Sequence, residues 1–141
     1  GKKRKVGDIL LEPTKIYVND VLPLIKKRYV SSIAHITGGG ILENLPRVLP
    51  QNLCCIIDAG DFKIPKVFLW LQKLGKIDNL EMLKTFNCGL GLIMIVSKHK
   101  KKKVLSYFKN LNIKTHQIGV IKDSKSKKNI IVKKFGEWDL K

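Results

Sequence analysis

The sequence predicts an α+β fold in which helices flank a mixed β-sheet. Segments with apolar residues at helical spacing and short β-rich segments both occur, and they do not alternate strictly along the chain. The length of 141 residues suits one compact domain with a substantial buried core. No apolar run approaches the roughly 18–20 residues of a membrane-spanning helix. We therefore expect a cytoplasmic protein without a membrane partner.

The first half of the chain is expected to supply two helices and two strands. Residues 1–7 are basic and without periodicity, which is typical of a linker or a frayed start, so the domain itself is expected over residues 8–141. Pro13 is expected to open a helix over residues 13–28, with an apolar stripe of Ile16, Val18, Val21, Leu22 and Ile25. The elements expected next are a strand over residues 31–37, a short helix over 41–50 and a buried strand over 52–58.

The second half is expected to add helices, a central strand and a hairpin. Pro65 should start a helix that ends at Gly75, with Val67, Phe68, Trp70 and Leu71 facing inward. Phe86 is also expected in the core. The remaining elements are a helical turn over residues 79–86, the central strand over 88–96, and an amphipathic helix over 98–112 that buries Val104, Leu105, Phe108 and Leu111. A β-hairpin of residues 113–122 and 129–135 completes the prediction.

The net charge of +17 raises the question of nucleic-acid binding. Lysine supplies 25 of the 28 basic residues, however, and aromatic residues make up only 7% of the chain. Nucleic-acid readers usually rely on arginine for bidentate contacts and on aromatic rings for stacking. We therefore expect a solvated lysine surface that attracts polyanions without specificity, and no specific nucleic-acid partner. A basic nucleic-acid-binding module is the alternative from another functional class.

The cysteines and histidines do not form a metal motif. Cys54, Cys55 and Cys88 are odd in number and lack the spacing of zinc ligands, and the three histidines are far apart. Three small buried side chains in a reducing compartment are the simplest interpretation of the cysteines. No metal ligand is expected in this chain.

Three consecutive glycines, Gly38 to Gly40, separate the strand expected over residues 31–37 from the next helix. Glycines readily adopt positive φ, and successive exposed N–H groups form a nest that binds an anion. A flexible turn explains the same residues. From the residues alone, both interpretations stay open.

Polar side chains near the glycines are the candidate site residues. His35 is a candidate acid/base or hydrogen-bonding residue, or a satisfied histidine at a strand end. Asn44 and Arg47 are spaced to share a helical face. One interpretation is that both side chains contact substrate. The alternatives are that Asn44 caps the turn and that Arg47 forms a surface or interdomain salt bridge. Thr85 and Asn87 precede the glycine-containing strand and either line a cleft or belong to the strand entry.

Five segments occur in a fixed order: LLEPTKIYV, HITGGGILENLPRVLP, VFLWLQKLG, EMLKTFNCGLGLIMIV and HQIGVI. This series resembles the C-terminal half of phosphoribosylformylglycinamidine cyclo-ligase, also called aminoimidazole ribonucleotide synthetase, over about residues 8–132. A lone GGG would carry little weight, but HITGGG, ENLPRVLP and TFNCGLG in series are specific. The resemblance implies the α+β C-terminal domain of that superfamily.

The resemblance also implies a reaction. Family members use ATP, with Mg²⁺, to close formylglycinamidine ribonucleotide into aminoimidazole ribonucleotide in purine biosynthesis, and they act as homodimers of two-domain chains. It further implies that Thr37, Gly38, Gly39 and Gly40 approach the phosphorylated substrate, next to either its ribose phosphate or the transferred phosphoryl group. His35 stands where other superfamily members tend to carry aspartate, which favours the purine cyclo-ligase.

Family chains carry a nucleotide-binding N-terminal domain before the LLEPT segment, and its acidic and glycine-rich motifs do not occur in this sequence. We therefore expect that ATP and Mg²⁺ bind mainly to an N-terminal domain that is absent here, and that this chain is inactive alone. A fragment, one chain of a split enzyme and an inactive remnant that serves as an interaction partner all fit. A related superfamily domain, such as that of formylglycinamidine ribonucleotide synthetase, is the alternative among enzymes.

Overall fold

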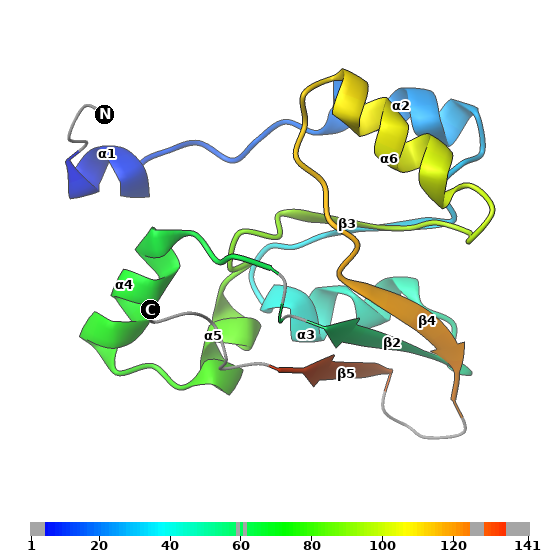
Figure 1. Cartoon of the computed structure of the whole chain (residues 1–141). Coiled ribbons are helices and arrows are strands. Elements are labelled where there is room, and N and C mark those ends of the chain that lie inside the picture. The colour runs from blue at the N-terminus through cyan, green and yellow to red at the C-terminus, as the bar shows by residue number, and fades with distance from the viewer. Residues whose placement is uncertain (1–4, 59, 61, 125–128, 135–141) are drawn as a thin grey trace.

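The computed structural model describes residues 5–58, 60, 62–124 and 129–134. Helices and strands are mixed along the chain, and the α+β prediction is confirmed (Figure 1). In chain order the elements are α1 (Val6–Leu10), α2 (Val18–Lys26), β1 (Ser32–His35), α3 (Gly40–Asn44), the 3₁₀ helix η1 (Pro46–Val48), β2 (Leu53–Asp58), α4 (Lys66–Gly75), α5 (Asn79–Thr85), β3 (Leu92–Ile95), α6 (Lys101–Asn110), β4 (Gly119–Asp123) and β5 (Ile130–Lys133).

The strands of the described residues form two sheets rather than one. Strands β1 and β3 pair antiparallel, whereas β4, β2 and β5 form a mixed sheet in that order, with β4 antiparallel and β5 parallel to β2. The prediction that residues 88–96 form a central strand was therefore wrong, because β3 pairs with β1 alone among the described residues. The predicted hairpin was also wrong, since β2 lies between β4 and β5. The hairpin pattern correctly implies that β4 and β5 run in opposite directions, but it does not reveal that a third strand separates them.

Two apolar clusters occupy the two faces of the β1–β3 ribbon. Because successive side chains of a strand point to opposite faces, Ile33 and Met94 pack against the cluster formed by α2 and α6, and Ala34 and Ile93 belong to the larger cluster on the other side. The larger cluster also contains residues of α3, α5 and β2. Figure 1 shows α2 and α6 side by side on one side of β1 and β3, with the mixed sheet on the other.

Helix α2 is shorter than expected and buries a different face. It begins at Val18, whereas residues 13–17 precede it without helical structure, so Pro13 does not open the helix. Its buried residues are Val21 and Leu24, which pack with Val104 and Phe108 of α6. Four members of the predicted stripe are exposed: Ile16, Val18, Leu22 and Ile25. Contact with α6 determines which face of α2 is buried. The spacing of apolar residues within α2 carries no information about that contact.

Helix α4 contributes less to the core than expected. None of its residues is buried, and Trp70 is 43% exposed although it was predicted to be a core residue. Phe68 does contact the core, where its ring lies 5.9 Å from that of Phe86. The helix ends at Gly75, as predicted, and the left-handed residue that follows it is Lys76 (φ +50°). Figure 1 shows α4 at the margin of the molecule, in agreement with this exposure.

The N-terminal segment and helix α6 also differ in part from expectation. Val6 and Gly7, expected in a linker or frayed start, belong to α1, a helix with no buried residue at the end of an extended segment. The rest of the basic start, residues 1–4, lies outside the described residues. Helix α6 buries Val104 and Phe108 as predicted, but Leu111 follows the helix and is exposed.

Candidate functional site

The topology brings the HITGGG and TFNCGLG segments together. Because β1 and β3 are antiparallel, the end of β1 lies beside the start of β3, and His35 is paired with Leu92. The Ile36 amide continues this contact by donating a hydrogen bond to the Gly91 carbonyl (2.9 Å). The loop that leaves β1, Thr37 to Gly40, is hereafter the glycine loop. It therefore lies next to the loop that enters β3.

Gly40 packs the glycine loop onto the end of α5. It is buried and has a φ of +53°, a conformation that L side chains rarely adopt. A Cβ atom at this position would overlap the Leu83 carbonyl oxygen and lie 2.7 Å from its carbon and 3.0 Å from the Phe86 oxygen. Glycine is therefore required here for the approach of two backbone segments.

Asn44 holds the other side of the glycine loop. Its side chain is buried, and its amide nitrogen donates to the carbonyls of Gly40 (2.8 Å), Gly38 (3.0 Å) and Thr37 (3.4 Å). An amide NH₂ group has two hydrogens, so these three carbonyls occupy it fully. Of the two alternatives for Asn44, the geometry supports the turn-capping role over direct contact with substrate.

The same bonds determine where the loop amides point. In a planar trans peptide the C=O and N–H vectors are antiparallel. Since the carbonyls of Thr37 and Gly38 point toward Asn44, the N–H groups of Gly38 and Gly39 point away from it. Neither N–H donates a hydrogen bond to another described residue. The glycine loop thus presents two successive free N–H groups, and Gly38 is exposed. This is the donor arrangement of an anion-binding nest.

His35 lies at the edge of this region and contacts Tyr17. The side chain is exposed, and its ring meets the Tyr17 ring edge to face, with 6.0 Å between centroids. The Tyr17 hydroxyl also fills the space above Gly91, where a Cβ would collide with it. Sequence reasoning missed Tyr17, because nothing in the local pattern around residue 17 indicates a contact with residues 35 and 91.

Arg47 lies beside Asn44, as the spacing of three residues predicts. Its guanidinium donates to the Asn44 side-chain oxygen (3.4 Å) and lies 3.8 Å from the Glu43 carboxylate. The Arg47 side chain is 65% exposed, so these contacts orient it without removing it from solvent. Glu43 was not among the predicted site residues.

Thr85 and Asn87 do not reach the glycine loop with their side chains. The Thr85 hydroxyl donates to Glu81 (2.9 Å) within α5, and the Asn87 side-chain oxygen accepts from the Gly89 amide (2.9 Å) in a local turn. Only the backbone of this segment approaches the loop, at Gly40. The geometry therefore supports the interpretation that Thr85 and Asn87 belong to the strand entry. It does not support the interpretation that their side chains line a cleft.

The glycines of the TFNCGLG segment serve internal packing. Gly89 has a φ of +93°, and a Cβ there would lie 2.5 Å from the Pro65 ring. Gly91 accommodates Tyr17 as described above. Side chains of this chain therefore occupy the space beside both glycines.

The three cysteines are free and buried, as predicted. Burial raises the pKa of the Cys88 thiol to about 11. Burial, with a smaller contribution from neighbouring Cys54, raises the pKa of the Cys55 thiol to about 11 as well. Both stay protonated at neutral pH, whereas a nucleophilic cysteine needs a thiolate.

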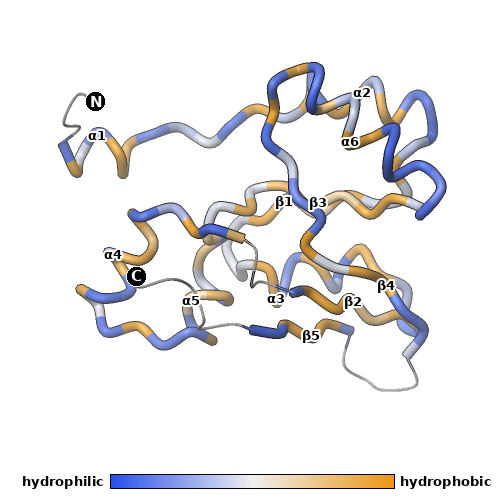
Figure 2. Tube along the Cα trace, viewed as in Figure 1, coloured by the Kyte–Doolittle hydropathy of each residue, from blue (hydrophilic) through white to orange (hydrophobic). Residues whose placement is uncertain are grey.

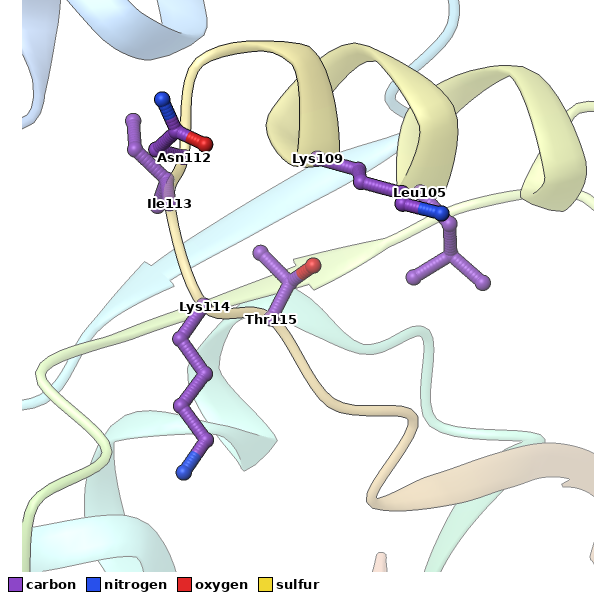
Figure 3. Close-up of a pocket in the computed structure, with 6 residues that line it drawn as sticks. All are labelled: Leu105, Lys109, Asn112, Ile113, Lys114 and Thr115. Carbon is purple, nitrogen blue, oxygen red and sulfur yellow. The ribbon is translucent and has the colours of Figure 1, made fainter.

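The rest of the described structure offers few features of a ligand site. Within the described ranges, no group of three or more His, Cys, Asp or Glu side chains is arranged to hold a metal ion. No helix among the same residues is long and apolar enough to span a bilayer. A shallow hollow of about 430 Å³ lies at the C-terminal end of α6 (Figure 3) and is lined by Leu105, Lys109, Asn112, Ile113, Lys114 and Thr115. It contains none of the predicted site residues.

The chain is similar to members of a known protein family. Residues 1–132 match the family model described as "AIR synthase related protein, C-terminal domain". Three relatives are each named "Trifunctional purine biosynthetic protein adenosine-3". The chain is 54% identical to that of Chironomus tentans over 99 residues, which are 70% of this chain and 7% of the relative. It is 49% identical over 100 residues to those of Homo sapiens and Gallus gallus, which are 71% of this chain and 10% of each relative. The chain thus spans a tenth or less of the length of these curated relatives.

Proposed function

The chain belongs to the family of AIR synthase-related C-terminal domains, and from this premise we propose that it forms the C-terminal part of a purine-pathway cyclo-ligase. The proposed enzyme converts formylglycinamidine ribonucleotide to aminoimidazole ribonucleotide at the expense of ATP. The names of the three relatives, all purine biosynthetic proteins, support this assignment.

The observation that carries the proposal is the pair of outward N–H groups in the glycine loop. Gly38 and Gly39 present donors with no partner among the described residues, while Asn44 fixes the carbonyls of the same loop. The substrate and both products of ATP cleavage carry phosphate oxygens. We assign the glycine loop to one of these phosphates, either that of the ribose or the transferred phosphoryl group.

The chemistry of the proposed reaction explains why fixed donors would help. The formyl oxygen attacks the γ-phosphorus of ATP, and ADP leaves. An amidine nitrogen of the substrate then attacks the formyl carbon. The C–O bond breaks with its electrons going to oxygen, inorganic phosphate departs, and the nitrogen loses a proton. Negative charge shifts among phosphate oxygens throughout, and N–H donors that are already in position stabilise such charge without reorganisation.

The roles of His35 and of the cofactors follow from the same proposal. His35 is exposed near the loop and is a candidate to accept the proton that the nitrogen loses. Mg²⁺ would neutralise charge on the ATP phosphates, but the described residues offer no carboxylate cluster for it. We therefore propose that an N-terminal domain binds ATP with Mg²⁺ and forms the homodimer, and we assign no step of this chain to the ion.

Reconstitution tests the proposal. This chain would be mixed with the nucleotide-binding N-terminal domain of a cyclo-ligase, and ATP-dependent formation of aminoimidazole ribonucleotide would be measured. Product is expected from the mixture and from neither part alone. A full-length relative assayed in parallel verifies the conditions. A pair that co-elutes as a complex but stays inactive, while the full-length relative turns over, would contradict the proposal.

Replacing Arg47 by lysine tests the substrate-facing role of that side chain. In the active assembly we expect kcat/KM to fall about tenfold or more, because lysine cannot reproduce the guanidinium fork and a charged hydrogen bond contributes about 1.5–3 kcal/mol. Stability should change by less than about 0.5 kcal/mol, since exposed ion pairs contribute little.

The matched control for Arg47→Lys is Lys102→Arg, an exposed residue of α6. It makes the reverse exchange far from the loop and is expected to leave kcat/KM unchanged. Equal losses of kcat/KM in the two variants would show that the guanidinium geometry of Arg47 is not required.

A further inference from the structure

Eight of the 28 basic residues of this chain lie together at one corner of the molecule. The C-terminal end of α2 and the N-terminal end of α6 together carry eight: Lys26, Lys27, Arg28, Lys98, Lys100, Lys101, Lys102 and Lys103. We call this set the α2–α6 basic cluster. Figure 2 shows these two stretches as hydrophilic segments at neighbouring ends of the two helices.

Specific contacts hold the two halves of the cluster together. The Lys100 ammonium donates to the Arg28 carbonyl (2.6 Å), a bond between residues 72 positions apart. The ammonium groups of Lys100 and Lys103 lie 5.9 and 5.8 Å from the centre of the Tyr29 ring. The fold therefore assembles this charge from two distant segments.

No acidic side chain among the described residues forms an ion pair with the cluster. The sequence contains no Asp or Glu between Asp20 and Glu43, or between Glu81 and Asp123. Asp20 is the one carboxylate on the two helices, and it pairs with Lys15 (3.0 Å). None of the ion pairs among the described residues includes a side chain of the cluster. Its positive potential is thus available to an outside partner.

We propose that the α2–α6 basic cluster binds the phosphodiester backbone of a nucleic acid, without sequence preference. Seven of the eight cluster side chains are exposed and Lys100 is half-buried, and each exposed ion pair contributes little alone. A linear polyanion contacts several cations at once, and each contact releases counterions. Protein interfaces, in contrast, are depleted in lysine and centre on buried aromatic or apolar anchors.

A pair of charge-matched variants tests this proposal in the intact chain. The cluster variant replaces Lys26, Lys27, Lys98 and Lys102 by glutamine. The control variant replaces Lys63, Lys66, Lys73 and Lys84, which lie on or near α4 and α5. All eight side chains are exposed, and none makes a hydrogen bond or ion pair with another described residue. Circular dichroism and urea unfolding establish that both variants fold.

Binding to a fluorescent 20-nucleotide RNA of mixed sequence would be titrated between 50 and about 300 mM salt. For the cluster variant we expect at least about tenfold weaker binding at low salt. Its slope of log affinity against log salt should be smaller by up to about 3, since each phosphate contact on a single strand contributes about 0.7. The control variant, with the same net charge, should differ from the wild type by less than about threefold. RNAs of different sequence should bind equally.

Three results would overturn the proposal. Equal losses in the two variants would assign binding to net charge rather than to the cluster. Undetectable RNA binding by the wild type at 50 mM salt would exclude nucleic-acid binding by the cluster. Because Leu22 and Ile25 beside the cluster are also exposed, vesicles containing phosphatidylserine form a further arm. Cluster-dependent binding to those vesicles with RNA binding unaffected would identify a membrane surface instead.

Discussion

Replacing Gly40 by alanine is expected to lower the free energy of unfolding by about 3 kcal/mol or more. The added Cβ would overlap the carbonyl of Leu83 at the end of α5, and backbone atoms cannot move aside as a flexible side chain does. The positive φ of +53° adds a further cost of about 1–2 kcal/mol for a residue with a side chain. The glycine loop and α5 would have to separate, so the larger apolar cluster would be disturbed as well.

Urea unfolding measures this loss, and Gly38→Ala is the matched control. Gly38 lies two residues away in the same loop, its φ is not positive, and nothing lies within 4 Å of the position of an added Cβ. We expect the control to unfold within about 0.5 kcal/mol of the wild type. If Gly40→Ala were as stable as Gly38→Ala, the packing of the loop on α5 would be wrong.

Replacing Asn44 by aspartate is expected to cost about 2–4 kcal/mol in stability. The side chain keeps its shape but exchanges the NH₂ donor for an oxygen, which then faces the carbonyls of Thr37, Gly38 and Gly40. One buried and two half-buried hydrogen bonds lose their donor, and a carboxylate is placed among the three carbonyls. The loop should also lose its fixed shape, so activity in the reconstituted enzyme should fall further than stability alone explains.

Urea unfolding at pH 7 and proteolysis of the loop would show the effect of Asn44→Asp. The control is Asn19→Asp in the first turn of α2, where the side chain is exposed and a carboxylate is favourable near a helix N-terminus. We expect that variant to be as stable as the wild type. An Asn44→Asp protein with an unchanged unfolding midpoint would mean that these hydrogen bonds do not hold the loop.

Local pattern predicted most elements of this fold but not their partners. The strands β1 and β2 and the helices α5 and α6 lie where turn residues and periodicity place them. The position of β2 between β4 and β5 was not predictable, because strand order depends on which edges the core leaves open. The buried face of α2 was missed for a similar reason, since Leu24 is selected by its contact with Phe108 of another helix.

The candidate site shows the same division. The glycine loop was identifiable from its three glycines and from the family resemblance, and the spacing of Asn44 and Arg47 correctly placed them side by side. The role of each side chain was not predictable, because it depends on which groups the side chain hydrogen-bonds in the folded chain. Asn44 binds the loop rather than facing outward, Asn87 binds its own turn, and Tyr17 enters the region from a segment with no site motif.

The most direct test of the account is the activity of the Gly38→Ala variant in the reconstituted enzyme. The structure leaves open space at Gly38, so the protein itself does not require glycine there. A phosphate bound to the N–H groups of Gly38 and Gly39 would be crowded by the new methyl group. We predict that kcat/KM falls about tenfold or more while the unfolding free energy is unchanged, a difference in transition-state binding of about 1.4 kcal/mol or more. Full activity in this variant would contradict the account, because it would show that no ligand approaches the glycine loop.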